Sequence, residues 1–555
     1  MPEQAQSNPL ELTPAAQAQL VASLREPGCY LHSASPIETL ETHISHVLLV
    51  DEYAYKIKKP LDLGFLDFTT LDQRRFYCTE EVRLNRRLAP DIYLNVVPIG
   101  GSVAVPQLGM EPAIEYAVKM RRFGQEGLFD AMLARGELTS AHMDELALLI
   151  ADFHSRLPAA DQDSPYGSPE NIMAPAHQNF DQLRPLLRRP DQQASLDAIQ
   201  AATESAYAQL QQTFVERQRS GWVRECHGDL HLGNIALVDD RITVFDCIEF
   251  NPNLRWIDVM SEVAFLVMDL IVRNQKALAY RFVNAYLVQS GDYAGMAVLR
   301  FYLAYRAMVR AKVHGLRARQ PGAGKAEKKR ALRDCLRYLK LALTFFNSDR
   351  PALIINHGLS GSGKTVFSQS ALETLGAVCV RSDVERKRLH HLPANARTGS
   401  GVESDLYSRA ATRATYQHLV ELARSIVTAG FPVIVDATFI ARWQRDQFHA
   451  LARTLCVPFV IVDYRASIST LRLRVQMRER LGTDASEAGL AVLEKQLETE
   501  QRLSADERSW VMRFNSERAL DPRRLHRTWQ RLAHKIVKMA AHKGDPQAEC
   551  NADRC

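Results

Sequence analysis

The chain has 555 residues, which is more than one hydrophobic core normally holds and therefore predicts at least two domains. Hydrophobic residues make up 46% and charged residues 24% of it, a balance that is typical of a folded globular protein and excludes a largely disordered or fibrous one. The net charge of +5 arises from 69 basic and 64 acidic side chains, so the total alone gives no strong field for binding polyanions.

The sequence shows neither a membrane span nor a secretion signal. The most apolar run, residues 263–272, is interrupted by Asp269 and is much shorter than the roughly 20 residues of a membrane helix. Residues 1–20 are polar and acidic and contain no signal-peptide core. The nine cysteines are scattered singly without a CxxC pair, which argues against a zinc site or a disulfide framework. We therefore expect a cytoplasmic protein.

The N-terminal part of the chain begins with a leader over residues 1–34 and then changes from strands to helices. Short β-rich runs occur at residues 46–50 and 53–57. Amphipathic patterns predict helices at residues 71–88, 140–157, 257–272 and 296–316. This order predicts an α+β domain over residues 35–346, with a small mixed lobe followed by a large helical lobe.

The C-terminal part has a different pattern. A basic loop at residues 317–330 precedes a helix that ends near Phe346, and residues 347–351 form the predicted linker. Short apolar strands then alternate with helical segments, and the predicted strands are residues 353–356, 377–381, 433–435 and 459–464. The alternation predicts an α/β domain with a parallel sheet over residues 352–540, followed by a flexible tail over 541–555.

A phosphate-binding loop is the strongest motif in the chain. The sequence GLSGSGKT fits the G-x-x-x-x-G-K-[ST] pattern between a predicted strand and a predicted helix, and consists of Gly358, Leu359, Ser360, Gly361, Ser362, Gly363, Lys364 and Thr365. The glycines let backbone N–H groups turn toward phosphate at a helix N-terminus. Lys364 is then expected to contact the β- and γ-phosphates of ATP, and Thr365 to hold Mg²⁺. The alternative is a glycine-rich turn without nucleotide.

Two aspartates follow later strands of the same predicted sheet. Ligands bind at the carboxyl ends of such strands, so Asp383 is placed to orient or deprotonate an accepting hydroxyl. Asp436, at the end of VIVDATF, is placed to reach Mg²⁺ directly or through water. Either carboxylate could instead cap a helix or a turn.

An arginine-rich helical stretch, RLRLRVQMRER, could close over the nucleotide. Its candidate residues are Arg474, Arg478 and Arg480, whose planar guanidinium groups suit phosphoryl oxygens, although a solvated basic face is the alternative. Together with SDVERKRL and DATF, this stretch resembles the small P-loop kinases that include polynucleotide 5'-kinases, chloramphenicol phosphotransferases and zeta-toxin-like enzymes. The resemblance covers residues 352–540 and implies a kinase rather than a motor ATPase.

The N-terminal part carries a second motif, HGDLHLGN, at residues 227–234. Its spacing matches the catalytic loop of protein-kinase-like folds, in which Asp229 would accept the proton of the substrate hydroxyl and Asn234 would hold Mg²⁺. The strand predicted at residues 242–245 delivers Asp246 as a second metal ligand. The loop resembles that of aminoglycoside, choline and fructosamine phosphotransferases, which implies a supporting role for His227. A polar β-hairpin without catalysis is the alternative.

Upstream, the segment AYKIKK predicts a strand that presents Lys56 and Lys58 on one face, and Glu81 is a candidate partner of the phosphate-binding lysine. Lys58 is slightly favoured for that role, and an ordinary basic strand is the alternative. Residues 115–123 are expected to form the strand and hinge between the lobes. No glycine-rich G-x-G-x-x-G loop precedes Lys56, so the small lobe is expected to be abbreviated.

Taken together, residues 35–540 resemble a bacterial family of bifunctional proteins in which an aminoglycoside phosphotransferase-like domain is fused to an AAA-type ATP-binding P-loop kinase domain. The resemblance implies an enzyme with two Mg-ATP sites that phosphorylates hydroxyl groups of small-molecule or nucleotide-like acceptors. Two alternatives stay open. The N-terminal half could be a ligand-sensing pseudokinase that regulates the P-loop domain, or the chain could be a kinase of nucleic-acid 5' ends.

Overall fold

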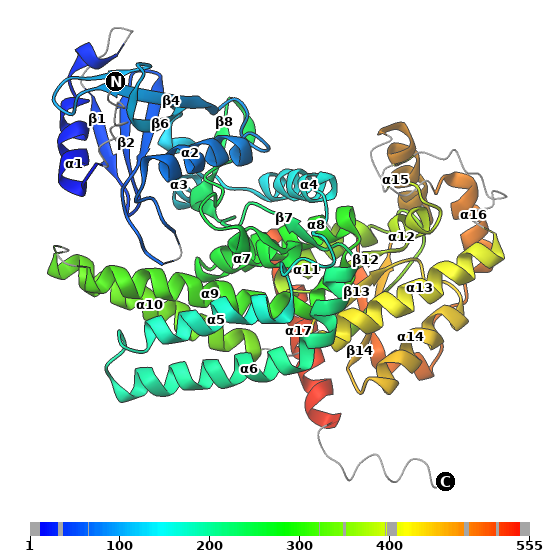
Figure 1. Ribbon diagram of the computed structural model, residues 1–555. Helices are drawn as coiled ribbons and strands as arrows, with labels where there is room; N and C mark the ends of the chain where they lie inside the picture. Colours follow the sequence, from blue (N-terminus) through cyan, green and yellow to red (C-terminus); the bar gives the residue numbers. More distant parts are fainter. Residues whose placement is uncertain are drawn as a thin grey trace, which may run out of the picture. The chain divides into compact units, whose positions relative to one another are not determined.

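The computed structural model describes residues 12–30, 37–64, 66–320, 322, 324–347, 351–393, 396, 408–481, 488–517 and 521–543 (Figure 1). The chain forms two compact units. The first unit comprises Met1–Leu138, Phe153–Ile172 and Val215–Leu266, and the second comprises Thr139–Asp152, Met173–Phe214 and Val267–Cys555. This division differs from the boundary expected at residues 347–351, because helices of the N-terminal half belong to the second unit. Much of the expected leader, residues 348–350 of the expected linker and the tail from residue 544 lie outside the described residues.

A six-stranded antiparallel sheet forms the small lobe of the first unit. Its strands, in spatial order, are β1 (Glu38–Glu41), β2 (Ser45–Val50), β3 (Tyr53–Lys58), β6 (Ala113–Arg121), β4 (Tyr93–Gly101) and β5 (Pro106–Leu108). The expectation of an abbreviated small lobe is therefore wrong. The prediction used the glycine-rich loop as the sign of a complete small lobe. In this protein residues 42–44, which contain no glycine, join β1 to β2 instead. Thr42 Oγ1 in this connection accepts a hydrogen bond from Ser45 N at 3.0 Å.

Part of the expected leader is helix α1 (Pro14–Ser23), which packs on this sheet. Thr13 caps the helix, and Leu20 is fully buried in the cluster that also contains Leu48 and Ile57 of the sheet. Gln17 is buried as well, and its Nε2 donates to Lys58 O and to Glu115 Oε2, each at 2.7 Å. The described part of the leader is therefore a structural element of the first unit.

Helix α2 (Leu71–Asn85) packs against β4 and β6 and begins with a capping box. Thr70 Oγ1 accepts from Gln73 N, and the Gln73 side chain accepts from Thr70 N, so backbone donors of the first turn are satisfied on both sides. The helix turns two long polar side chains into the lobe, of which Glu81 is fully buried. The other, Arg74, pairs through Nε with Glu115 Oε1 at 2.9 Å.

The remaining elements of the first unit surround the kinase-like loop. A tight turn at Asp239 and Asp240, with φ angles of 49° and 58°, joins the two strands that carry Asn234 and Asp246 at their outer ends. The elements are α3 (Phe129–Arg135), β7 (Val223–Glu225), β8 (Ile235–Val238), β9 (Arg241–Val244) and β10 (Trp256–Asp258), with β7 pairing β10 and β8 pairing β9.

Long helices lie on both sides of the kinase-like motif in the chain, between the small lobe and the P-loop part. They are α4 (Ser140–Arg156), α5 (Pro169–Leu183), α6 (Pro190–Arg219), α7 (Val259–Val272), α8 (Lys276–Ser290), α9 (Met296–Arg319) and α10 (Lys325–Phe346). The sequence analysis did not identify α5, α6 or α8. The basic loop expected at residues 317–330 is also shorter than predicted, because α10 already begins at Lys325 and Arg317 Nε pairs with Glu327 Oε1 at 2.8 Å.

A five-stranded parallel sheet dominates the rest of the second unit. Its strands, in spatial order, are β12 (Val378–Arg381), β13 (Val433–Asp436), β11 (Leu353–His357), β14 (Phe459–Arg465) and β15 (Val511–Asn515). The four predicted strands are confirmed within two residues, and β15 was missed. The helices of this part are α11 (Lys364–Leu375), α12 (Ser382–Leu389), α13 (Arg409–Thr428), α14 (Arg442–Thr454), α15 (Ile468–Leu481), α16 (Leu490–Thr499) and α17 (Pro522–Lys543).

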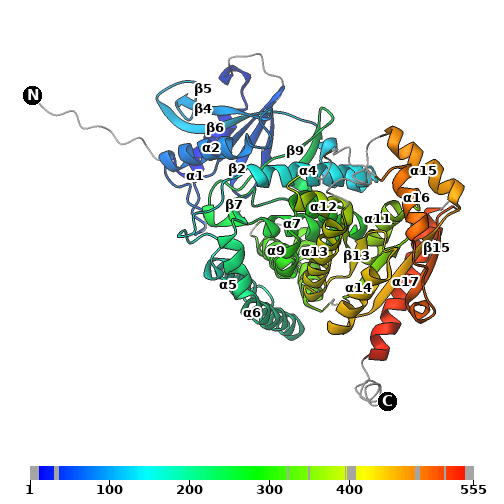
Figure 2. The same cartoon turned by 90° about the vertical axis from the view of Figure 1, so that its right-hand side faces the viewer.

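Helices cover both faces of this sheet. Helix α13 packs against β13 and α14 (Figure 2). Helix α17 packs against α11, and its Trp529 and Leu532 are fully buried in one cluster with Ile354 of β11. Strands β11 and β13 are buried along their whole length, as is typical of parallel strands with helices on both sides. In the described part of the chain, no helix is both long and apolar enough to cross a membrane.

Candidate phosphotransfer sites

The loop between β11 and α11 has the backbone conformation that a phosphate cradle requires. Gly358, Gly361 and Gly363 have φ angles of 149°, 81° and 84°, which residues with a side chain rarely adopt. A Cβ atom at Gly363 would also lie 2.9 Å from the Phe367 ring. The glycines thus allow the turn that directs backbone N–H groups and the N-terminus of α11 toward a bound anion.

Lys364 is buried in this loop and folds back over it. Its Nζ donates to Gly358 O at 2.8 Å and to Leu359 O at 2.9 Å. Burial lowers the pKa of the Lys364 amine to about 8, although the carboxylates of Asp436 and Asp383 oppose this shift. The ammonium group is therefore destabilised in the absence of an anionic ligand and would gain from binding phosphate.

Oxygen donors gather beside the lysine. The Thr365 hydroxyl donates to Asp436 Oδ2 at 2.7 Å, and Asn356 Nδ2 donates to Asp436 Oδ1 at 3.1 Å. A hydroxyl and a carboxylate are ligands that Mg²⁺ accepts, directly or through water, so these residues fit a magnesium ion. Asn356 fixes the carboxylate from the buried strand β11 and was not identified from the sequence.

A cavity of about 420 Å³ extends from the loop to α12 and α13. Lys364 and Thr365 line it together with Asp383, Arg386 and Tyr416. On the other side of the loop, Gly358, Leu359 and Ser362 line a second cavity of about 1170 Å³. The predicted Asp383 and Asp436 therefore share one cavity with the loop, whereas Arg386 and Tyr416 were not assigned a role from the sequence.

The arginine-rich stretch is helix α15, and two of its three candidate residues line the smaller cavity. Arg474 donates from Nη2 to Ser516 O at 2.7 Å and from Nη1 to Gly361 O at 3.3 Å, and Arg478 donates to Ala488 O. Arg480 is exposed and is not among the residues that line this cavity. Both Arg474 and Arg478 are thus held near the loop by backbone carbonyl groups.

The kinase-like motif in the first unit is ordered by a buried histidine. His227 Nδ1 accepts from Asp229 N at 3.3 Å, so Nε2 carries the proton and donates to Phe245 O at 2.9 Å. Burial lowers the pKa of His227, which keeps the imidazole in this neutral form. The side chain thereby connects the loop that carries Asp229 to the strand end that carries Asp246.

Three candidate residues converge at this loop. Asn234 Nδ2 donates to Asp229 O and to Asp229 Oδ2, both at 3.0 Å, which leaves the amide oxygen of Asn234 for another partner. Asp246 follows β9 in a left-handed conformation with φ of 64°, and its backbone N donates to the Tyr93 hydroxyl at 3.1 Å. The amide oxygen and the two carboxylates are an oxygen donor set that fits Mg²⁺.

Two lysines of β3 reach Glu81 from the same face of the strand. Lys56 Nζ lies 2.8 Å from Glu81 Oε1 and 2.7 Å from Asp246 Oδ1. Lys58 Nζ lies 2.6 Å from Glu81 Oε2, pairs with Glu249 as well, and is fully buried. Burial opposes ionisation of Glu81, but the two ammonium groups outweigh it and lower the pKa of the carboxyl group.

Comparisons with known proteins agree with both motifs. Residues 97–302 match the model described as phosphotransferase enzyme family, and residues 353–503 match the model described as AAA domain. The protein Rv2004c of Mycobacterium tuberculosis strain H37Rv is 31% identical over 481 residues, which cover 84% of this chain and 92% of the mycobacterial protein. A protein of Mycobacterium bovis, Mb2027c, matches with the same values. The chain belongs to their family, the phosphotransferase and P-loop kinase fusion family.

Solved structures are similar to parts of this fusion protein. A choline/ethanolamine kinase family protein from Mesorhizobium loti is 12% identical, with a TM-score of 0.36, and covers 60% of this chain and 99% of its own. The APS kinase CysC of Mycobacterium tuberculosis is 16% identical, with a TM-score of 0.26, and covers 34% of this chain and 99% of its own. A gluconokinase from Sinorhizobium meliloti is 21% identical, with a TM-score of 0.25, and covers 34% and 98%.

In this member of the fusion family, the geometry distinguishes the two lysines that the sequence left open. Lys56 contacts Asp246, whose side chain is half exposed, whereas Lys58 is enclosed between Glu81 and Glu249. Lys58, which the sequence slightly favoured, is therefore the less exposed of the two lysines. Glu249 was missed because it lies 191 residues from Lys58 in the chain and in no recognised motif.

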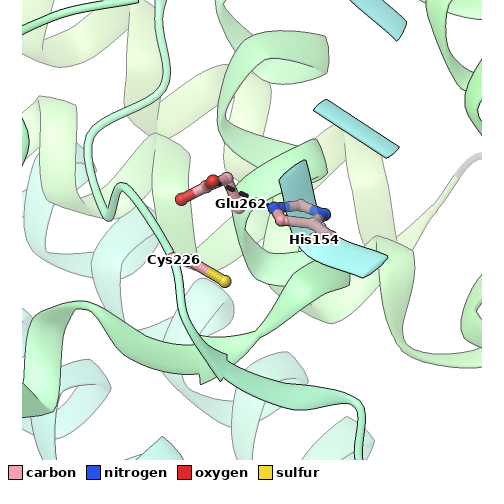
Figure 3. Close-up of side chains that lie close together, drawn as sticks. All are labelled: His154, Cys226 and Glu262. Atoms are coloured by element: carbon pink, nitrogen blue, oxygen red, sulfur yellow. Dashed lines mark hydrogen bonds and ion pairs between the residues drawn. The ribbon is translucent and has the colours of Figure 1, made fainter. Parts of the chain in front are cut away.

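A further network of buried hydrogen bonds supports the kinase-like loop of the fusion protein. Figure 3 shows His154, Cys226 and Glu262, whose ligand atoms lie within 4.8 Å of one another. His154 Nε2 donates to Glu262 Oε1 at 3.0 Å, and Gly228 N donates to Glu262 Oε2 at 2.7 Å. Since both carboxylate oxygens already accept protein hydrogen bonds, we assign His154 and Glu262 to positioning Gly228, next to Asp229, rather than to a metal.

Proposed function

We propose that the chain is an ATP-dependent phosphotransferase with two Mg-ATP sites, one in each unit, which transfers γ-phosphate to hydroxyl groups of small-molecule or nucleotide-like acceptors. The observation that carries the proposal is the same combination in both units, namely a lysine beside oxygen donors that suit Mg²⁺. In the second unit these are Lys364, Thr365 and Asp436, and in the first they are Lys56, Asn234 and Asp246.

At the P-loop site, Lys364 and the backbone N–H groups of the loop would bind the phosphates, and Arg474 and Arg478 would neutralise charge that develops during transfer. Asp383 would orient the accepting hydroxyl and take its proton. The hydroxyl oxygen forms a bond to the γ-phosphorus while the bond to the bridging oxygen breaks and ADP leaves. Mg²⁺, held near Thr365 and Asp436, would supply further charge neutralisation when bound.

At the kinase-like site, Lys56 would contact the nucleotide phosphates, with Glu81 holding its ammonium group in place. Asp229 would accept the proton of the acceptor hydroxyl, and Asn234 and Asp246 would hold Mg²⁺. His227 and Glu262 would act by positioning the loop, since both bond to backbone groups of the loop or of the strand end beside it, namely those of Phe245, Asp229 and Gly228.

Two other functions remain as alternatives. The connection between β1 and β2 consists of Thr42, His43 and Ile44 and has no glycine, which favours a first unit that binds a ligand without catalysis. The intact set of Asp229, Asn234 and Asp246 opposes that alternative. A kinase of nucleic-acid 5' ends is favoured only by the basic stretches, and its binding should weaken steeply with salt.

The proposal is tested by a screen for γ-phosphate transfer from labelled ATP to metabolite pools, aminoglycosides and oligonucleotide ends. The full chain is compared with Lys364→Ala and with Asp229→Asn. We expect each labelled product to disappear in only one of the two variants, which assigns that product to one site. Transfer that persists in the doubly substituted chain would refute the proposal.

We further propose that residues 35–346 and 352–540 are the two domains and that the protein is located in the cytoplasm.

A further inference from the structure

Helix α8 lies inside the segment that matches the phosphotransferase family, yet it packs against elements of the P-loop part, while its Arg281 also pairs with Asp144 of α4. Helix α8 and the P-loop part both belong to the second unit. Helix α8 packs against α11 and against β12, the edge strand of the parallel sheet. An edge strand presents unpaired backbone groups, so the residues that cover it determine how firmly it is held.

Asn284 of α8 covers the outer edge of β12 with its side-chain amide. Its Oδ1 accepts from Cys379 N at 2.7 Å, and its Nδ2 donates to Ala377 O at 3.0 Å. The amide thus makes the pair of hydrogen bonds that the peptide group of a neighbouring strand would make. Asn284 is 4% exposed, so water cannot readily replace these bonds if the side chain is lost.

The end of the same helix also holds α12, which directly follows β12. Arg388 of α12 donates from Nη2 to Val288 O at 2.6 Å, and its guanidinium group lies over the Tyr293 ring just beyond α8. The Arg388 side chain packs closely against Gly291, since a Cβ atom at Gly291 would lie 2.9 Å from Arg388 Nε. Contacts from one helix therefore fix both the strand before α12 and the C-terminal part of α12.

The side chains of α12 that face the smaller cavity lie, along the chain, between Arg388 and the residues bonded to Asn284. Asp383 and Arg386 of α12 both line it, opposite the phosphate-binding loop. The loop itself belongs to β11 and α11, in the centre of the sheet, and Asn356 and Thr365 fix it through Asp436. Helix α8 thus holds the strand and the helix on the acceptor side of the cavity, whereas its ion pair with α11, from Arg281 Nη1 to Glu373 Oε1 at 3.3 Å, lies near the end of α11 that is away from Lys364.

We infer that Asn284 and Arg388 are positioning residues of the P-loop site, through which helix α8 sets the distance from Asp383 to the γ-phosphate. This inference rests on the proposed function of that site. It gives the helical segment of the N-terminal half a role in the chemistry of the C-terminal half. It also means that a fragment starting at residue 352 lacks the helix that positions part of its active site.

The test uses the full chain with Asp229→Asn and Asp246→Ala together, so that both turnover and nucleotide binding come from the P-loop site alone. Asn284→Leu removes the amide, and Gln289→Leu is a matched control on an exposed position of the same helix. Binding of a non-hydrolysable ATP analogue with Mg²⁺ is measured by calorimetry, and turnover by ATP hydrolysis with water as acceptor. Lys364→Ala in the same background should abolish hydrolysis, and failure there would refute the function and not the positioning role.

We expect Asn284→Leu to bind the analogue within about twofold of the control but to hydrolyse ATP roughly tenfold to a hundredfold more slowly, because a small misplacement of a reacting group has an effect of that size. A merely structural role would lower binding and turnover together. Arg388→Gln, at a half-exposed position, should give the same separation and decides the question if Asn284→Leu does not fold. Turnover equal to the control in a folded Asn284→Leu or Arg388→Gln protein would overturn the inference.

Discussion

The Nζ atom of Lys56 lies 2.7 Å from the Oδ1 atom of Asp246, so the β3 lysine and the aspartate that follows β9 meet directly. Glu81 completes the contact from α2. Lys58, two residues further along β3, has its charge balanced by Glu81 and Glu249 and is fully buried. The two lysines therefore have separate roles, one facing the site and the other supporting the lobe.

Substitution of each lysine by methionine should separate these roles. Lys56→Met is expected to abolish nucleotide binding at the first site while the free energy of unfolding changes little, because Glu81 keeps Lys58 as a partner. Lys58→Met leaves Glu249 buried without its cation and should destabilise the protein by about 3–5 kcal/mol. Denaturant unfolding and calorimetry measure the two effects. Equal losses of stability in both variants would contradict the assignment.

Asp229→Asn should leave the fold nearly unchanged and abolish phosphotransfer by the first unit. The amide keeps the size of the side chain but cannot accept a proton from the acceptor hydroxyl. Transfer is measured with the products that the acceptor screen assigns to this unit. Asp239→Asn in the exposed turn between β8 and β9 is the matched control. A variant with the activity of the parent would show that Asp229 is not the base.

The phosphate-binding loop could be predicted from eight consecutive residues, since glycines, lysine and threonine at fixed spacing already specify the turn. The positions of Asp383 and Asp436 followed from a rule about strand ends. The choice between Lys56 and Lys58 could not be made, because strand alternation places both on one face and only their contacts with Asp246 and Glu249 distinguish them. Tertiary contacts of this kind leave no local pattern.

The same limit explains other omissions. Asn284 is one polar residue in a helix that the sequence analysis did not identify, and nothing near it indicates a bond to Cys379. Gln496 of α16 accepts from Ser360 N at 2.9 Å, although its own surroundings carry no motif. Strand β15 was missed because only one of its five residues is fully buried, so its apolar pattern is weak.

Lys364→Ala in the full chain should reduce ATP turnover at the P-loop site by about a hundredfold or more, the size of effect seen when a group that stabilises transition-state charge is removed. The full chain is needed because α8 contacts β12 and α12, and α12 carries Asp383 of this site. Lys340→Ala, at an exposed position on α10, is the control. Full turnover by Lys364→Ala in the Asp229→Asn background would contradict the assignment of the loop.

The lowered pKa of Lys364 predicts that nucleotide binding takes up a proton at alkaline pH. With a pKa of about 8 in the free protein, most of the amine is neutral at pH 8.5, and bound phosphates favour its charged form. Affinity at this site should therefore fall as the pH rises above 8, with an uptake approaching one proton. Calorimetry in two buffers of different ionisation enthalpy measures the uptake. Lys364→Arg, which stays charged, should show none.

The full chain should bind two nucleotides at sites that are independent of each other. The groups of each candidate site lie within one unit: Lys364, Thr365 and Asp436 in the second, Lys56 and Asp246 in the first. Calorimetry with a non-hydrolysable ATP analogue and Mg²⁺ should therefore give a stoichiometry near two for the parent chain. Lys364→Ala and Asp246→Ala should each reduce it to near one. If the parent binds one nucleotide and only Lys364→Ala removes it, the first unit does not bind ATP, and the regulatory alternative replaces the two-site proposal.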